Sequence, residues 1–119
     1  MQEKPGTICI SGHDVPLWCD IFVINELQEQ YGTVGAFERK LVGVAETEEG
    51  KIIKKEKDLG AITFALRLMI KEGYKKLEAM GEITEKPDIE QLMMEVNIPF
   101  TELAEIIHNT FRRCFASKK

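Results

Sequence analysis

Apolar residues recur every three or four positions over much of the chain, the spacing that places side chains on one face of an α-helix. This period predicts helices over about residues 20–31, 33–42, 58–80, 88–95 and 99–116. Ahead of them, TICISGHDVPLW alternates apolar and polar residues on both sides of a turn, so residues 7–18 are expected to form a β-hairpin. The expected fold class is mainly α with a short N-terminal β-hairpin (α+β), a compact helical bundle of about five helices.

Residues that favour helix ends support these boundaries. Four residues suited to an N-cap precede a predicted helix: Asp20, Thr33, Asp58 and Asp88. Gln91 follows Asp88 at the spacing of a capping box, and Gly32 suits the end of the first helix. Gly73 lies inside the longest helix, which is expected either to continue or to kink there, because glycine costs about 1 kcal/mol relative to alanine.

The longest predicted helix is apolar on more than one side. One stripe is expected to face the core and contains Leu59, Ile62, Leu66, Ile70, Leu77 and Met80. A second stripe of Ala61, Phe64 and Leu68 is expected roughly opposite the first. Either the rest of the protein surrounds this helix or a partner covers one of its faces.

Residues 43–58, GVAETEEGKIIKKEKD, interrupt the helical pattern with charge. They are expected to form a solvated loop, with a brief strand at Ile52 and Ile53. The last helix returns to a clear pattern, in which one face carries Phe100, Leu103, Ile107, Phe111 and Cys114. Met93 and Met94 form an adaptable pair that suits core filling or a binding groove.

Composition narrows the class of protein. A chain of 119 residues with 44% hydrophobic and 30% charged residues predicts a single folded domain over residues 1–119. A net charge of −4 disfavours nucleic-acid binding. The apolar run at 59–70 is shorter than the about 18 residues that a membrane span needs, and the N-terminus lacks the apolar stretch of a secretory signal. We therefore expect no membrane contact and no export.

The sequence offers little chemistry. Its two histidines and three cysteines lack zinc-ligand spacing, and no phosphate-binding or nucleophile motif occurs. Cys9 and Cys19 could face each other across the hairpin, although reduced thiols in packing roles are the preferred interpretation. We expect no catalytic, cofactor-binding or metal-binding residue, no cofactor and no enzyme activity. Recognition of another protein is the function that remains.

The order of these parts resembles the tail assembly chaperones of long-tailed bacteriophages and related prophages. The hairpin opens the chain, and VINELQEQYG at 23–32 is similar to that family's ALxELEEKYG helix. LRLMIKEGY at 66–74 is similar to its apolar helix ending near a glycine, and DIEQLMMEV and FTELAEIIHNTF to its closing short and long helices. The resemblance covers almost the whole chain, in pattern and order and without an invariant motif. The lysine-rich KIIKKEKD departs from it.

The resemblance implies a non-enzymatic protein of the host cell cytoplasm. Such a chaperone binds the tape measure protein and assists tail tube assembly, with the tail tube protein as a further partner. The candidate contact residues are then Ala61, Phe64 and Leu68, with Ile106 and Phe115 beside the main face of the last helix. The family commonly makes a longer product by ribosomal frameshift, and a sequence ending in Lys118 and Lys119 is compatible with an A-rich slippery site.

Three other hypotheses stay open. A small helical adaptor or regulatory protein would bind a different cytoplasmic protein, although FTELAEIIHNTFRR offers basic residues only at its end, unlike a DNA-recognition helix. A self-associating structural protein, or homo-oligomer, would cover the second stripe with another copy of the chain. An enzyme of unrecognised type would require an isolated cleft with perturbed ionisable groups.

Overall fold

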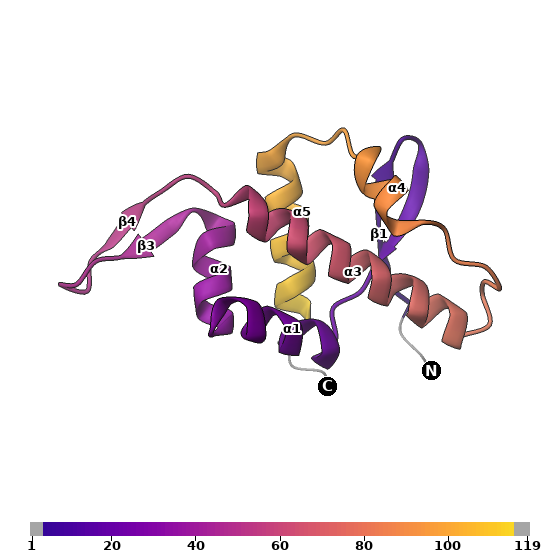
Figure 1. Cartoon of the computed structure of the whole chain (residues 1–119), viewed down its shortest axis with the longest axis horizontal. Helices are drawn as coiled ribbons and strands as arrows, with labels where there is room; N and C mark the ends of the chain where they lie inside the picture. Colours follow the sequence, from indigo (N-terminus) through magenta and orange to yellow (C-terminus); the bar gives the residue numbers. More distant parts are fainter. Residues whose placement is uncertain (1–3, 116–119) are drawn as a thin grey trace.

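Helix α3 runs through the centre of the molecule, and the N-terminal hairpin and the other four described helices pack around it (Figure 1). The structure is a computed structural model that describes residues 4–115. In chain order its elements are β1 (Gly6–Ile10), β2 (His13–Leu17), α1 (Ile21–Tyr31), α2 (Val34–Val42), β3 (Val44–Glu46), β4 (Ile52–Lys54), α3 (Leu59–Ala79), α4 (Ile89–Met94) and α5 (Phe100–Arg113). The expected fold class, five helices with an N-terminal β-hairpin, is confirmed. No helix in the described part is both long and apolar enough to cross a membrane.

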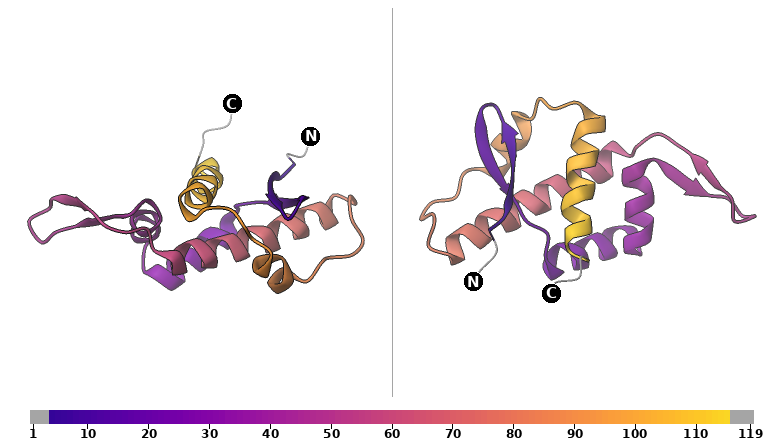
Figure 2. Two further views of the ribbon diagram at one scale, coloured as in Figure 1. Left: turned by 90° about the horizontal axis from the view of Figure 1, so that it is seen from above. Right: turned by 180° about the vertical axis from the view of Figure 1, so that it is seen from behind.

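The N-terminal hairpin forms as its alternation predicts. β1 and β2 pair antiparallel with Ile8 opposite Val15, around a turn at Ser11 and Gly12 that has positive φ at both residues. One face of the hairpin is completely covered and carries Ile8, Ile10, Val15 and Leu17. Figure 2 shows that the hairpin and α5 lie on the same side of α3.

The hairpin docks on α3 at close range. The Trp18 backbone N–H donates to the Met69 carbonyl oxygen at 3.1 Å, and Lys76 Nζ lies 4.5 Å from the Trp18 ring centroid. A Cβ atom at Gly73 would lie only 2.6 Å from the Pro16 carbonyl oxygen. Gly73 therefore lets the strand approach, and α3 continues through it as one helix.

The buried face of α3 is wider than its sequence pattern predicts. Ile62, Leu66 and Ile70 are buried as expected, but Ala65 and Met69 are fully buried as well. These two residues lie between the two predicted stripes, so the stripes are the edges of one broad face and not opposite sides. The prediction for Leu59 is wrong, because this residue lies beyond the packed elements and is exposed.

The predicted N-caps are confirmed. The side chains of Asp20, Thr33, Asp58 and Asp88 each accept at least one backbone N–H bond from the first turn of their helix. The reciprocal half of the capping box is absent, because the Gln91 side chain donates instead to Glu95 Oε2 at 2.9 Å. The last helix ends at Arg113, earlier than predicted, and Ala116 lies outside the described residues.

Residues 43–58 differ from the expected loop. β4 confirms the brief strand at Ile52 and Ile53, and it pairs with β3, which the sequence pattern had not indicated. The two strands form an arm that projects from the helices (Figure 1), in a molecule measuring 52 × 35 × 24 Å. No residue between Val44 and Lys57 is buried. The arm is therefore a protrusion outside the core.

Candidate interaction groove

An apolar groove lies between the N-terminal half of α3, helix α4 and the start of α5. Its volume is about 320 Å³. Eight apolar residues contribute to its lining: Leu59, Leu66, Met93, Met94, Val96, Ile98, Phe100 and Leu103. Leu66 and Leu103 are buried and form its floor. We call this feature the α3–α4–α5 groove.

Three large apolar side chains stand open along this groove. Leu59 is 47% exposed, Met94 80% and Phe100 59%. They belong to three different helices. A single exposed apolar residue is normal on a protein surface, but three that converge on one groove require an explanation. The arrangement is typical of a surface that another apolar surface covers.

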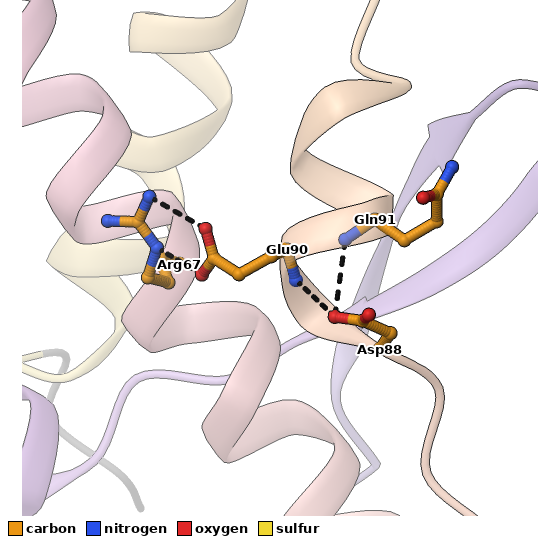
Figure 3. A network of polar contacts seen from close by, with 4 residues as sticks. All are labelled: Arg67, Asp88, Glu90 and Gln91. Carbon is orange, nitrogen blue, oxygen red and sulfur yellow. Dashed lines mark hydrogen bonds and ion pairs between the residues drawn. The ribbon is translucent and has the colours of Figure 1, made fainter.

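Capping and one ion pair fix the walls of the groove. Asp58 caps α3 just ahead of Leu59, and Asp88 Oδ1 accepts the N–H groups of Glu90 and Gln91 at 3.0 and 3.4 Å. The Arg67 guanidinium donates to both carboxylate oxygens of Glu90, at 2.7 and 3.3 Å (Figure 3). This bidentate pair holds the short helix α4 against α3.

Helix α4 has two further anchors. Leu92 points into the core, and the Ser11 hydroxyl donates to the Glu95 carbonyl oxygen at 3.1 Å. The turn of the N-terminal hairpin therefore supports the C-terminal end of α4. Met94, on the opposite side from Leu92, is left facing solvent as a consequence.

The contact residues expected from the sequence lie elsewhere. Ala61 is completely buried and offers no surface to a partner, because it packs inside the broad face of α3. Phe64 is half-buried, with its ring edge-to-face against Tyr31 at 5.9 Å between centroids. Ile106 is half-buried against the core as well. None of these three residues lines the α3–α4–α5 groove.

The remaining two candidates line separate depressions. Leu68 contributes to a groove of about 520 Å³ beside Trp18 and the exposed Phe22, which we call the α1–α3 groove. Phe115 is exposed, packs edge-to-face against Phe111 with centroids 5.2 Å apart, and borders a hollow beside Val34. The structure therefore does not bring the five sequence candidates together.

The sequence contained a partial signal for the α3–α4–α5 groove. The Met93–Met94 pair had indicated either core filling or a groove, and both residues line this one. Leu59 had been assigned to a core stripe, and Phe100 to the apolar face of the last helix, because helical period alone cannot show where the covering elements end. The core assignment of Leu59 is wrong, and Phe100 is exposed, since each residue lies in the first turn of its helix beyond the packed region.

Cys9 and Cys19 do not face each other across the hairpin, as the sequence had allowed. Cys9 pairs with Asp14 on the exposed face, whereas the Cys19 and Cys114 side chains lie next to each other. Burial raises the pKa of Cys19 far above its ordinary value, and the neighbouring Cys114 thiol adds to this rise. Burial also raises the pKa of Cys114. Both groups are held as neutral thiols, which are poor nucleophiles.

Other ionisable groups form structural contacts. His108 Nε2 lies 2.7 Å from Glu38 Oε2 and joins α5 to α2. Within residues 4–115, no group of three or more His, Cys, Asp or Glu side chains is placed to hold a metal ion. The α3–α4–α5 groove contains Arg67 and Glu90 as its only charged lining residues in the described part, and they neutralise each other.

Comparisons of the chain with protein-family models, with curated proteins and with solved structures gave no match.

Proposed function

We propose that this protein is a phage tail assembly chaperone, which binds the tape measure protein in the host cell cytoplasm and assists tail tube assembly. The observation that carries the proposal is the α3–α4–α5 groove, where Leu59, Met94 and Phe100 are exposed on helices held in place by N-caps and an ion pair. The order of hairpin, helices and closing long helix on which the resemblance rests also supports it.

Physical chemistry connects this groove to the proposed task. A long helical protein presents apolar faces that aggregate before assembly, and a groove between helices can cover one such face. Methionine suits this use, because its unbranched and polarisable side chain adapts to different apolar partners. Release during assembly requires moderate affinity, which a groove of this limited size favours.

Co-expression tests the proposal directly. The protein is produced together with the tape measure protein of the same phage or prophage locus, and the soluble amount of the latter and its co-purification are measured. We expect the wild type to raise both. The double variant Met94→Gln with Phe100→Gln should lose both effects, while Phe22→Gln, an equally exposed aromatic position in the α1–α3 groove, should retain them.

Three results would overturn parts of the proposal. If the tape measure protein neither co-purifies nor becomes more soluble, the chaperone function is wrong. If Phe22→Gln abolishes binding and the double variant does not, the contact surface is the α1–α3 groove. If light scattering shows a stable homo-oligomer that the double variant dissociates, another copy of the chain covers the groove and self-association explains the exposed residues.

A further inference from the structure

The charges on two of the three walls of the α3–α4–α5 groove are one-sided. From Pro87 to Phe111 the sequence contains no lysine and no arginine, but it carries Asp88, Glu90, Glu95, Glu102 and Glu105. This stretch comprises α4, the loop after it and most of α5, which together form two of the three walls of the groove. The apolar floor is therefore combined with acidic charge along the walls that α4, the loop after it and α5 provide.

Among residues 4–115, only one cation lines the groove, and it is already neutralised. Arg67 is held in the bidentate pair with Glu90. Glu95 follows Met94 directly, and Glu102 precedes Leu103 in the exposed first turn of α5. Neither Glu95 nor Glu102 takes part in an ion pair among residues 4–115. Glu95 and Glu102 do not line the groove themselves, but each is next in sequence to a residue that does, and the only bond that the Glu95 carboxylate accepts within residues 4–115 comes from the neutral Gln91 amide at 2.9 Å.

We infer that the α3–α4–α5 groove binds an amphipathic helix whose polar flanks are basic. The apolar face of such a helix would cover Leu59, Met94 and Phe100, while its lysines or arginines would approach Glu95 and Glu102. This inference rests on the proposed function and deepens it, because it names the class of partner segment that the groove selects.

The same charges disfavour other occupants of this groove. An acidic helix would place like charges together, which costs free energy and slows association. A second copy docking through the same acidic surface would meet the same repulsion. An anionic membrane surface attracts basic segments and would repel this one. A basic helix is the occupant that satisfies both the apolar floor and the acidic walls.

Two designed helical peptides test the inference. They share the same leucine and methionine positions, and their polar positions carry lysine in one peptide and glutamate in the other. Fluorescence anisotropy measures the affinity of each labelled peptide for the full chain at low and at raised salt. We expect the lysine peptide to bind at least about tenfold more tightly and to weaken as salt is added.

Matched charge variants distinguish the groove from the net charge of the protein. Glu95→Lys with Glu102→Lys should lower the affinity for the lysine peptide by about tenfold or more. Glu48→Lys with Glu49→Lys makes the same charge change at the turn of the arm, far from the groove in sequence and structure, and should have little effect. Should the first variant fail to fold, Glu95→Gln with Glu102→Gln provides a milder version with the same expected direction.

The outcomes separate this inference from the proposed function. Equal binding of both peptides, binding of neither, or equal effects of the two charge variants would overturn the inference. If the tape measure protein still co-purifies in any of those cases, the chaperone function stands and only the partner chemistry is wrong. Selective binding of the lysine peptide without co-purification of the tape measure protein would support the groove chemistry and overturn the chaperone function.

Discussion

Individual residues in this protein are constrained most where two elements approach each other closely. Gly73 lies under the Pro16 carbonyl group, and Cys19 and Cys114 meet between the segment before α1 and the end of α5. In both places the neighbours, and not the intrinsic preference of the residue, decide what is tolerated. Substitution and titration experiments can measure these local constraints.

Gly73→Ala should destabilise the protein. Helix propensity alone would favour alanine by about 1 kcal/mol, but the added Cβ would lie 2.6 Å from the Pro16 carbonyl oxygen. The backbone there can move only by separating the hairpin from α3, so we expect a net loss of about 1 to 3 kcal/mol in the free energy of unfolding, measured by urea denaturation. Gly35→Ala in α2 is the control, since its nearest side-chain atom lies at 3.5 Å. A stabilised Gly73→Ala variant would contradict the docking geometry.

The buried thiols should make the protein less stable at alkaline pH. Burial raises the folded-state pKa of Cys19 above its ordinary value of 9.0. Below pH 9, the Cys19 thiol is protonated in both the folded and the unfolded protein. Above pH 9, the unfolded chain loses the thiol proton, whereas the folded protein retains it. The free energy of unfolding therefore falls as the pH rises past about 9. Urea denaturation from pH 8 to 10 should show a shallower fall for Cys19→Ser than for the wild type.

The exposed Cys9 provides the control for this measurement. Cys9→Ser makes the same substitution at an exposed thiol on the open face of the hairpin, away from the buried pair of thiols. Equal slopes in the wild type and in Cys19→Ser would show that the thiol of Cys19 titrates normally in the folded protein. Selective alkylation gives a second readout, with Cys9 expected to react first under native conditions.

At the level of elements, the shortest helix, α4, depends on a few specific side-chain contacts for its position. α4 contains six residues, too few to be stable alone, and it is held by its Asp88 cap, the Arg67–Glu90 pair and the buried Leu92. The same helix supplies Met93 and Met94 to the groove. Loss of its supports should therefore reduce binding as well as stability.

Asp88→Ala should cost more stability than loss of the ion pair. An N-cap side chain contributes about 0.5 to 2 kcal/mol, whereas an exposed ion pair contributes about 0 to 1 kcal/mol. The Glu90 side chain is 63% exposed, so solvent screens its attraction to Arg67. Comparing the unfolding free energies of Asp88→Ala and Glu90→Gln by chemical denaturation tests this order. A larger loss in Glu90→Gln would show that the bidentate pair determines the position of α4.

The whole molecule consists of a core organised on α3 and an arm that stands outside it. The residues with the least exposure come from the N-terminal hairpin and all five described helices, whereas β3 and β4 contribute none. Gly43 and Lys55 close the base of the arm through the bond from the Lys55 N–H to the Gly43 carbonyl oxygen at 2.7 Å. The arm should therefore be separable from folding.

Shortening the arm should leave the fold intact. Replacing residues 46–52 by Asn-Gly keeps the Ala45–Ile53 pair and forms a two-residue hairpin turn. Because no buried side chain is removed, we expect the thermal midpoint to change by less than about 4 °C, measured by circular dichroism. Peptide binding in the α3–α4–α5 groove should also be retained. An unfolded or molten variant would show that the arm contributes to the core.

The features predicted most accurately from the sequence are those that depend on interactions between residues close together in the chain. The four N-caps act within one helical turn, so residue type and spacing were sufficient to place Asp20, Thr33, Asp58 and Asp88. β3 was missed because three residues are too few to show an alternating pattern. Ala65 and Met69 fell between the two apolar stripes, and only the tertiary packing showed that they join them. The exposure of Phe100 likewise depends on where neighbouring elements end.

The central position of α3 also affects how the chain matures on the ribosome. The hairpin, α1 and α2 all bury their apolar faces against a helix that starts only at Leu59 and ends at Ala79. During translation, the hairpin therefore lacks the helix that covers it, and α1 and α2 can pack only against each other, until that later segment has left the exit tunnel. Ile8, Val15 and Leu27 stay accessible throughout this interval, so nascent-chain binding factors can reach them. Folding of the first half of this protein consequently waits for synthesis of the second.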